Sequence, residues 1–290
     1  MSDASPNLLS ARVTVHYPGK APVLRDVALD IAPGEVLGLV GQSGSGKSTL
    51  ALAILGLLSR KRATVEGTIV FQGADLLRMK ERDLRSLRGR SLSLVLQSPL
   101  SSLNPALRIR TQLKEAWRAH AATGANCDAA IQSAMTSVSL PADPDFLRKY
   151  PSQLSVGQAQ RVLIAMAVMH RPALLVADEA TSALDVITQS EILELFAQLN
   201  RTIGMSILYI SHDLPSVAGL CRRIAILHEG QIVENGPTDQ IFTAPAHEYT
   251  RRLMASLPRV PTSIQETLAK ARAASAGVSP ARPGSHYVSH

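Results

Sequence analysis

The hydrophobic pattern of the N-terminal third predicts short strands followed by a strand–loop–helix unit. Residues 9–15 and 23–31 alternate between apolar and polar positions, as half-buried strands do, and a turn at 17–19 separates them. An apolar run at 35–40 predicts a buried strand, and a helix-length apolar run at 49–58 follows it closely. The further elements expected here are strands at 68–71 and 92–96 and a short polar helix at 81–87.

The pattern changes to helical spacing between about residues 98 and 172. Amphipathic helices are expected at 107–122, 128–138 and 156–170, and no segment of this region has the alternation of a strand. We therefore predict a helical insertion within a larger unit.

Strands and helices alternate again after this insertion. The near-continuous apolar run 173–177 is typical of a parallel strand that is covered on both faces. Alternating elements of these lengths predict an α/β sheet. The elements expected to follow are helices at 186–200 and 214–220 and strands at 206–210, 224–228 and 231–233.

Composition narrows the class of protein. The chain has 290 residues, 46% of them hydrophobic and 18% charged, which is typical of a globular protein. No apolar run reaches the roughly 20 residues that cross a bilayer, and the N-terminus lacks the pattern of a secretory signal. A net charge of +7 suits nucleic acid, an acidic membrane surface or ATP, but 3% aromatic residues leave little to stack bases on, so we expect no nucleic-acid partner.

Candidate chemistry begins with a phosphate-binding loop at 41–48, which reads G-x-x-x-x-G-K-S between a predicted strand and a predicted helix. Its glycines let backbone N–H groups point at phosphate oxygens, and the start of the helix adds its dipole there. Lys47 is expected to contact the β- and γ-phosphates, and Ser48 to bind Mg²⁺. Such a loop indicates a nucleotide but not the reaction. The expected nucleotide-binding residues are Gly41, Gln42, Ser43, Gly44, Ser45, Gly46, Lys47, Ser48 and Thr49.

Polar side chains also follow three of the predicted strands. Asp178 and Glu179 end the apolar run 173–177, at the sheet edge where ligands bind. Side chains alternate along a strand, so one carboxylate can hold Mg²⁺ while the other polarises the attacking water. His212 follows the next strand, where it can hydrogen-bond the γ-phosphate, and Gln97 follows the strand at 92–96, where it can sense metal and water.

Leu154-Ser-Val-Gly-Gln158 precedes the predicted helix 156–170, and Ser155 can cap that helix. With this L-S-x-G-Q segment, the order and spacing of the motifs resemble the ATPase subunits of ABC transporters over roughly residues 8–245. The fold implied is an α/β phosphate-loop NTPase core with an antiparallel β lead-in and an inserted α-helical subdomain. The domain division implied is an ABC ATPase domain at 1–258, with its core at about 8–97 and 173–245 and the insertion at about 98–172, and a flexible C-terminal tail at 259–290.

The resemblance implies ATP and Mg²⁺ as cofactors and a role for each candidate residue. In this family the L-S-x-G-Q signature of one subunit covers the ATP held by the other. The implied roles are catalysis by Glu179, His212 and Gln97, metal binding by Ser48, Gln97 and Asp178, adenine stacking by Tyr17, and contact in trans by Ser155, Gly157 and Gln158.

Three further segments resemble the oligopeptide, dipeptide and nickel importer branch. They are 97–105, 183–186 and His247-Glu-Tyr-Thr-Arg251 with the following Leu-Pro. The usual form of the last motif is H-P-Y-T, so Glu248 departs from it. Longer members of the branch carry a cysteine cluster near the C-terminus, whereas this chain has no cysteine after Cys221, so no iron–sulfur cluster is implied.

Two other departures affect the chemistry. Val156 stands where the signature usually has a second glycine, and Ala180 follows the catalytic carboxylate where proline is usual. The bulk of Val156 would either crowd the γ-phosphate at the partner's site or point away from it.

These observations predict an ATP-hydrolysing subunit that powers an ABC importer for peptides or for metal chelates such as nickel. The implied partners are a second ABC ATPase subunit, identical or not, separate integral-membrane permease subunits that dock near Gln97, and indirectly an extracytoplasmic substrate-binding protein. The implied location is peripheral, on the cytoplasmic face of the inner (plasma) membrane. The alternative is a soluble ABC-type ATPase subunit of a non-transport complex, such as one in phosphonate metabolism.

Overall fold

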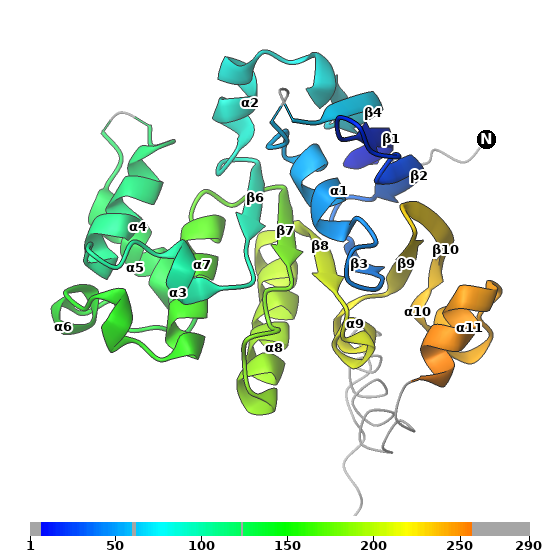
Figure 1. The fold of residues 1–290 in the computed structure, drawn as a ribbon. Helices are drawn as coiled ribbons and strands as arrows, with labels where there is room; N and C mark the ends of the chain where they lie inside the picture. Colours follow the sequence, from blue (N-terminus) through cyan, green and yellow to red (C-terminus); the bar gives the residue numbers. More distant parts are fainter. Residues whose placement is uncertain (1–6, 60–61, 123, 257–290) are drawn as a thin grey trace, which may run out of the picture.

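A six-stranded sheet forms the centre of the molecule (Figure 1) in a computed structural model that describes residues 7–59, 62–122 and 124–256. Its strand order is β10-β9-β3-β8-β7-β6, in which β10 runs antiparallel to β9 and the other neighbours are parallel. The carboxyl ends of the parallel strands therefore meet at one edge. The strands are β3 (Val36–Val40), β6 (Leu92–Val95), β7 (Leu174–Asp178), β8 (Ser206–Ser211), β9 (Arg223–His228) and β10 (Gln231–Pro237).

A four-stranded antiparallel sheet, in the order β2-β1-β4-β5, forms the predicted lead-in. Strand β4 (Thr64–Phe71) is longer than the predicted 68–71 because it pairs with the whole of β1 (Leu9–His16). Thr64 lies opposite His16, and Phe71 lies opposite Leu9. Gly67 interrupts the alternation in the sequence, but it is required there: φ is 106°, and a Cβ would collide with the Arg12 carbonyl. The strands are β1 (Leu9–His16), β2 (Leu24–Ile31), β4 (Thr64–Phe71) and β5 (Ala74–Asp75).

Each face of the six-stranded sheet is covered by its own hydrophobic core. Leu37, Leu39 and Val176 point to the side of α1 (Lys47–Ile54) and the antiparallel sheet. The alternate residues, such as Val40 and Leu175, point to the side of the long helices and the insertion. Covering on both faces explains why the parallel strands read as continuous apolar runs.

Helices make up the insertion beside β6, as the spacing predicts (Figure 1). No strand occurs between residues 98 and 172, leaving aside the single undescribed position there. Two short helices were not predicted; each has a proline in its first turn, after Ser98 and Asp143 respectively. The elements are α3 (Pro99–Ser102), α4 (Ile109–Arg118), α5 (Cys127–Ser137), α6 (Pro144–Leu147), the 3₁₀ turn η2 (Pro151–Gln153) and α7 (Val156–Val168).

Outside the insertion, helices occur where they were expected at 81–87, 186–200 and 214–220, whereas the first helix is shorter than expected and the short helix at Leu76–Arg78 was not expected. The first ends at Ile54 rather than 58, because Gly56 adopts a left-handed φ of 61°. Two C-terminal helices were not predicted, and the predicted tail at 259–290 lies outside the described residues. No helix in the described part of the chain is long and apolar enough to cross a membrane. These helices are η1 (Leu76–Arg78), α2 (Glu81–Leu87), α8 (Val186–Ile203), α9 (Leu214–Leu220), α10 (Thr238–Thr243) and α11 (Glu248–Ala255).

Candidate active site

The phosphate loop joins β3 to α1 at the carboxyl edge of the six-stranded sheet. Gly46 is the N-cap of α1 with φ 109°, and no side chain caps this helix, so its first backbone N–H groups have no capping side chain as acceptor. A Cβ on Gly41 would collide with the Leu227 carbonyl, and one on Gly46 would lie 2.6 Å from the Leu24 side chain. A Cβ on Gly44 would meet nothing within 4 Å. The loop is thus tightly packed at its two ends, around Gly41 and Gly46, and open at Gly44.

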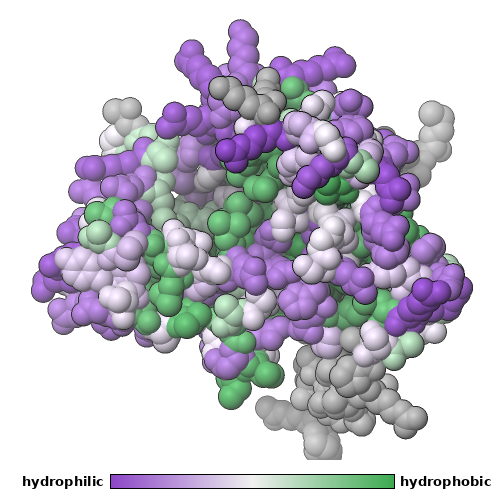
Figure 2. All heavy atoms as spheres, in the orientation of Figure 1, coloured by the Kyte–Doolittle hydropathy of each residue, from purple (hydrophilic) through white to green (hydrophobic). Residues whose placement is uncertain are grey.

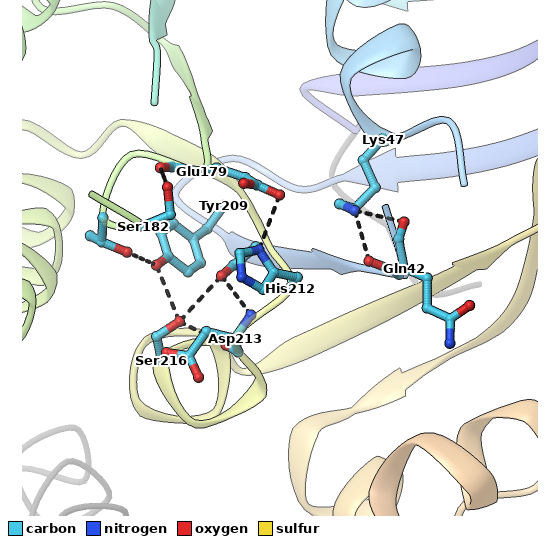
Figure 3. A network of polar contacts seen from close by, with 11 residues as sticks. Gln42, Lys47, Glu179, Ser182, Tyr209, His212, Asp213 and Ser216 are labelled. Atoms are coloured by element: carbon cyan, nitrogen blue, oxygen red, sulfur yellow. Dashed lines mark hydrogen bonds and ion pairs between the residues drawn. The ribbon is translucent and has the colours of Figure 1, made fainter. Parts of the chain in front are cut away.

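Lys47 lies against this loop, with 6% of the residue exposed. Its Nζ donates to the carbonyl oxygens of Gly41 at 2.7 Å and Gln42 at 3.0 Å (Figure 3), and an ammonium has a third N–H to donate. Burial lowers the pKa of Lys47, and the negative charges of Glu179 and Asp178 act in the opposite direction. A cation fixed in this way suits the phosphates of a nucleotide.

Asp178 ends β7, opposite Ile210 of β8. Its Oδ1 is buried and has no hydrogen-bond partner among the described residues. Burial raises the pKa of Asp178, and the neighbouring Ser48 hydroxyl opposes that shift. A buried carboxylate oxygen beside a hydroxyl fits Mg²⁺, a cation that takes its remaining ligands from phosphate and water. The described residues form no cluster of three His, Cys, Asp or Glu that would cage a metal ion without them.

Glu179, the next residue, faces His212 instead. Its backbone has φ 49°, and its amide donates to the Ile210 carbonyl at 2.9 Å. This left-handed conformation is costly for a residue with a side chain, and such strain is concentrated at functional sites. Glu179 Oε1 lies 3.2 Å from His212 Nδ1 (Figure 3), and the side chains are 22% and 58% exposed. The carboxylate can therefore accept a proton from a bound water while the imidazole holds its orientation.

A buried hydrogen-bond network beneath this pair was missed by sequence reasoning. Tyr209 is fully buried in β8; its hydroxyl shares a hydrogen bond with Thr181 Oγ1 at 2.8 Å and donates to Ser216 Oγ at 3.2 Å (Figure 3). Ser216 Oγ in turn donates to the Asp213 carbonyl at 2.7 Å. The network connects the loop after β7 to the loop after β8, from which Glu179 and His212 extend. Its one signal in the sequence is a tyrosine within the aliphatic run of β8.

Two other predicted residues lie near this edge without a direct bond to the loop. Gln97 is exposed and lies two residues beyond β6, whose Val95 is level with Ala177 of β7. The strand was predicted to end one residue later, at 96. Tyr17 is half-buried in the turn after β1. Val23, which ends the same turn, lies beside the phosphate loop: its carbonyl oxygen would be 3.3 Å from a Cβ placed on Gly46.

The signature lies elsewhere. Ser155 and Gln158 cap α7 reciprocally, each accepting from the other's amide at 3.2 Å. α7 packs beside β6. In the sheet, β6 lies three strands away from β3, so the two strands are separated by about 14 Å at the usual strand spacing. Ser155, Gly157 and Gln158 therefore do not join the Lys47 site within one chain. The Val156 side chain points outward and the residue is 39% exposed.

Comparison with known families decides the class of this site. The family model described as "ABC transporter" matches residues 24–182, which include the phosphate loop, the signature and the Asp178–Glu179 pair. The chain belongs to the ABC transporter ATPase family. A second model, "Oligopeptide/dipeptide transporter, C-terminal region", matches residues 233–287 of this ABC ATPase. Both the family and the importer branch expected from the motifs are thereby confirmed.

Curated relatives of the ABC ATPase are named as transport proteins. The "Dipeptide transport ATP-binding protein DppD" of Escherichia coli (strain K12) is 40% identical over 253 residues, which cover 85% of this chain and 77% of the relative. The "Peptidoglycan transport ATP-binding protein YejF" of Agrobacterium fabrum is 45% identical over 258 residues, but the match spans 47% of that relative's length. The non-transport alternative is not favoured.

Solved structures confirm the fold class, an α/β phosphate-loop NTPase core. The "Dimeric structure of a post-hydrolysis state of the ATP-binding cassette MJ0796 bound to ADP and Pi" superposes with a TM-score of 0.69 at 26% identity, over 79% of this chain and 98% of that one. The "Dimeric Structure of MJ0796, a Bacterial ABC Transporter Cassette" gives 0.68 at 27% identity, with the same coverage. The chain is therefore a nucleotide-binding ABC ATPase.

Proposed function

We propose that this ABC ATPase powers the import of peptides. Of the two cargo classes expected from the motifs, peptides are supported by the oligopeptide/dipeptide transporter match at 233–287 and by relatives named for dipeptide transport. The observation that carries the enzymatic part is the meeting of Lys47, Asp178 and the Glu179–His212 pair at one sheet edge.

Each side chain at this edge has a proposed step. Loop amides and Lys47 bind the β- and γ-phosphates of ATP, and Tyr17 stacks on the adenine. Ser48 and Asp178, with Gln97, would hold Mg²⁺, which would supply positive charge to the phosphate oxygens. As a water oxygen bonds to the γ-phosphorus and the bond from that phosphorus to the ADP oxygen breaks, Glu179 accepts the proton of the water and ADP and phosphate are the products. His212 keeps the carboxylate in place and contacts the γ-phosphate.

A second ATPase subunit completes the site in this proposal. The signature residues Ser155, Gly157 and Gln158 lie too far from Lys47 to serve it in one chain, so a partner's signature would cover the ATP. Val186 and Ile187, which begin α8, are large apolar residues with 82% and 74% of their surface exposed. Figure 2 shows apolar surface at the lower end of this helix. Such exposure favours a protein interface there.

A permease would dock on the helical insertion. A hollow of about 240 Å³ opens between β6, α3, α4 and α7, and its lining is mainly apolar, including Leu94, Leu163 and Met166. Leu96, which lines this hollow, is 44% exposed, and Leu100, three residues beyond Gln97, is 45% exposed. Contact here would transmit movement of Gln97 to the membrane subunits, from the cytoplasmic face of the membrane.

We also propose that the insertion, about 98–172, is part of one ATPase domain that spans 1–258.

Pairing predicts a concentration dependence of the isolated subunit. Phosphate release per subunit should rise as the concentration of the chain rises, and rise further on adding the second ATPase and the permease, because each site needs a signature from another chain. A colorimetric phosphate assay over a dilution series measures this, with molecular mass followed by light scattering. Full turnover by a demonstrated monomer, independent of concentration, would contradict the pairing.

A further inference from the structure

The motif at 247–251 has no role in the proposed function, yet it lies against the phosphate loop. It forms the start of α11, where His247 Nδ1 accepts from the Tyr249 amide at 3.2 Å. The chain before it is anchored to β10, because the Glu234 carboxylate accepts from the amides of Ala246 at 2.8 Å and His247 at 3.0 Å. Tyr249 is therefore presented from a fixed helix start.

Two contacts fix the direction of the Tyr249 side chain. Its ring stacks on the imidazole of His228 at the end of β9, with centroids 3.7 Å apart and planes 15° from parallel. Its hydroxyl accepts a hydrogen bond from the backbone N–H of Gln42 in the phosphate loop at 3.3 Å. A tyrosine from a segment about 200 residues away in the chain thus reaches the nucleotide site.

Gln42 is held from both sides as a result. Its backbone N–H donates to the Tyr249 hydroxyl, and its backbone carbonyl accepts from Lys47 Nζ at 3.0 Å. The turn after His228 holds the next part of the loop, since the Gly230 amide donates to the Ser45 carbonyl at 3.1 Å. The same short segment, 228–230, therefore supports both the loop and the tyrosine that contacts it.

We propose that Tyr249 is a positioning residue that holds the phosphate loop, through the Gln42 amide, in the shape that binds ATP. It does not touch the phosphates itself. Its hydroxyl limits movement of Gln42, and through Gln42 it limits movement of the Lys47 ammonium. The inference rests on the proposed ATP site, and it gives the C-terminal motif a function in nucleotide binding.

Tyr249→Phe tests this directly, because it removes the hydroxyl and keeps the ring that stacks on His228. In the full-length chain, the dissociation constant for MgATP should rise about fivefold, the scale of one hydrogen bond, while the maximal rate of hydrolysis at saturating ATP stays within about twofold. Titration calorimetry gives the first quantity and a steady-state assay the second. Tyr150→Phe is the matched control, because Tyr150 lies in the insertion, where its ring contacts Arg108. Removing the Tyr150 hydroxyl should change neither the dissociation constant for MgATP nor the maximal rate.

A Gln42→Pro background completes the test, since proline has no N–H to donate. There Tyr249→Phe should have no further effect on the affinity for MgATP. Wild-type affinity in Tyr249→Phe, or the same loss in the presence and absence of Gln42→Pro, would overturn the inference. If the wild-type chain bound no ATP at all, the proposed function would fail, a result that is distinct from equal binding by wild type and variant.

Discussion

Replacing Glu179 with glutamine is expected to lower ATP hydrolysis by about 10²-fold or more and to leave ATP binding intact. Glutamine keeps the shape and the hydrogen-bonding reach of the side chain, but it cannot take the proton of the attacking water. Lys47 and Ser48 are unchanged in this variant, so the phosphates stay bound. ATP held without hydrolysis should also keep two subunits together.

Phosphate release at saturating MgATP, in the complete pair, measures this effect. The partner's site must be blocked if it hydrolyses independently. Glu194→Gln is the matched control, since Glu194 is an exposed carboxylate of α8 outside the site. Size-exclusion chromatography should show an ATP-dependent dimer for Glu179→Gln. Turnover at the wild-type rate would mean that Glu179 is not the catalytic carboxylate.

Lys47→Ala should weaken ATP binding by at least tenfold, or about 1.4 kcal/mol. The variant loses a charge-assisted contact to the phosphates and leaves the Gly41 and Gln42 carbonyls without their donor. Calorimetric titration with MgATP measures the affinity. Lys80→Ala, which removes an exposed lysine ahead of α2, should bind ATP as the wild type does. Unchanged binding by Lys47→Ala would contradict the role given to the loop.

The elements that carry local signals could be predicted from the sequence. The loop at 41–48 lies between β3 and α1 because an apolar run, a glycine-rich turn and a second apolar run follow one another. The positions of Asp178 and His212 after neighbouring strands follow from the same reasoning, since parallel strands end at one edge.

Features set by long-range contacts could not be predicted. β4 extends back to Thr64 because β1 pairs with it, and a glycine in its middle hides the strand pattern. The left-handed φ of Glu179 and the buried bonds of Tyr209 depend on residues about 30 positions away. Gln42 and Tyr249, which are in contact, are 207 residues apart in the chain. The helix that carries Tyr249 is short, and a short helix has little intrinsic stability and hence a weak sequence signal.

Peptide uptake by the assembled transporter tests the central proposal most directly. The ATPase would be co-purified with its permease subunits, reconstituted in vesicles with the ATPase side facing out, and supplied with labelled dipeptide and binding protein inside. We predict transport of the labelled dipeptide out of the vesicle lumen that requires MgATP and falls to background with Glu179→Gln. Failure of the ATPase to associate with permease subunits, or dipeptide movement that is equal with and without MgATP, would contradict the proposal.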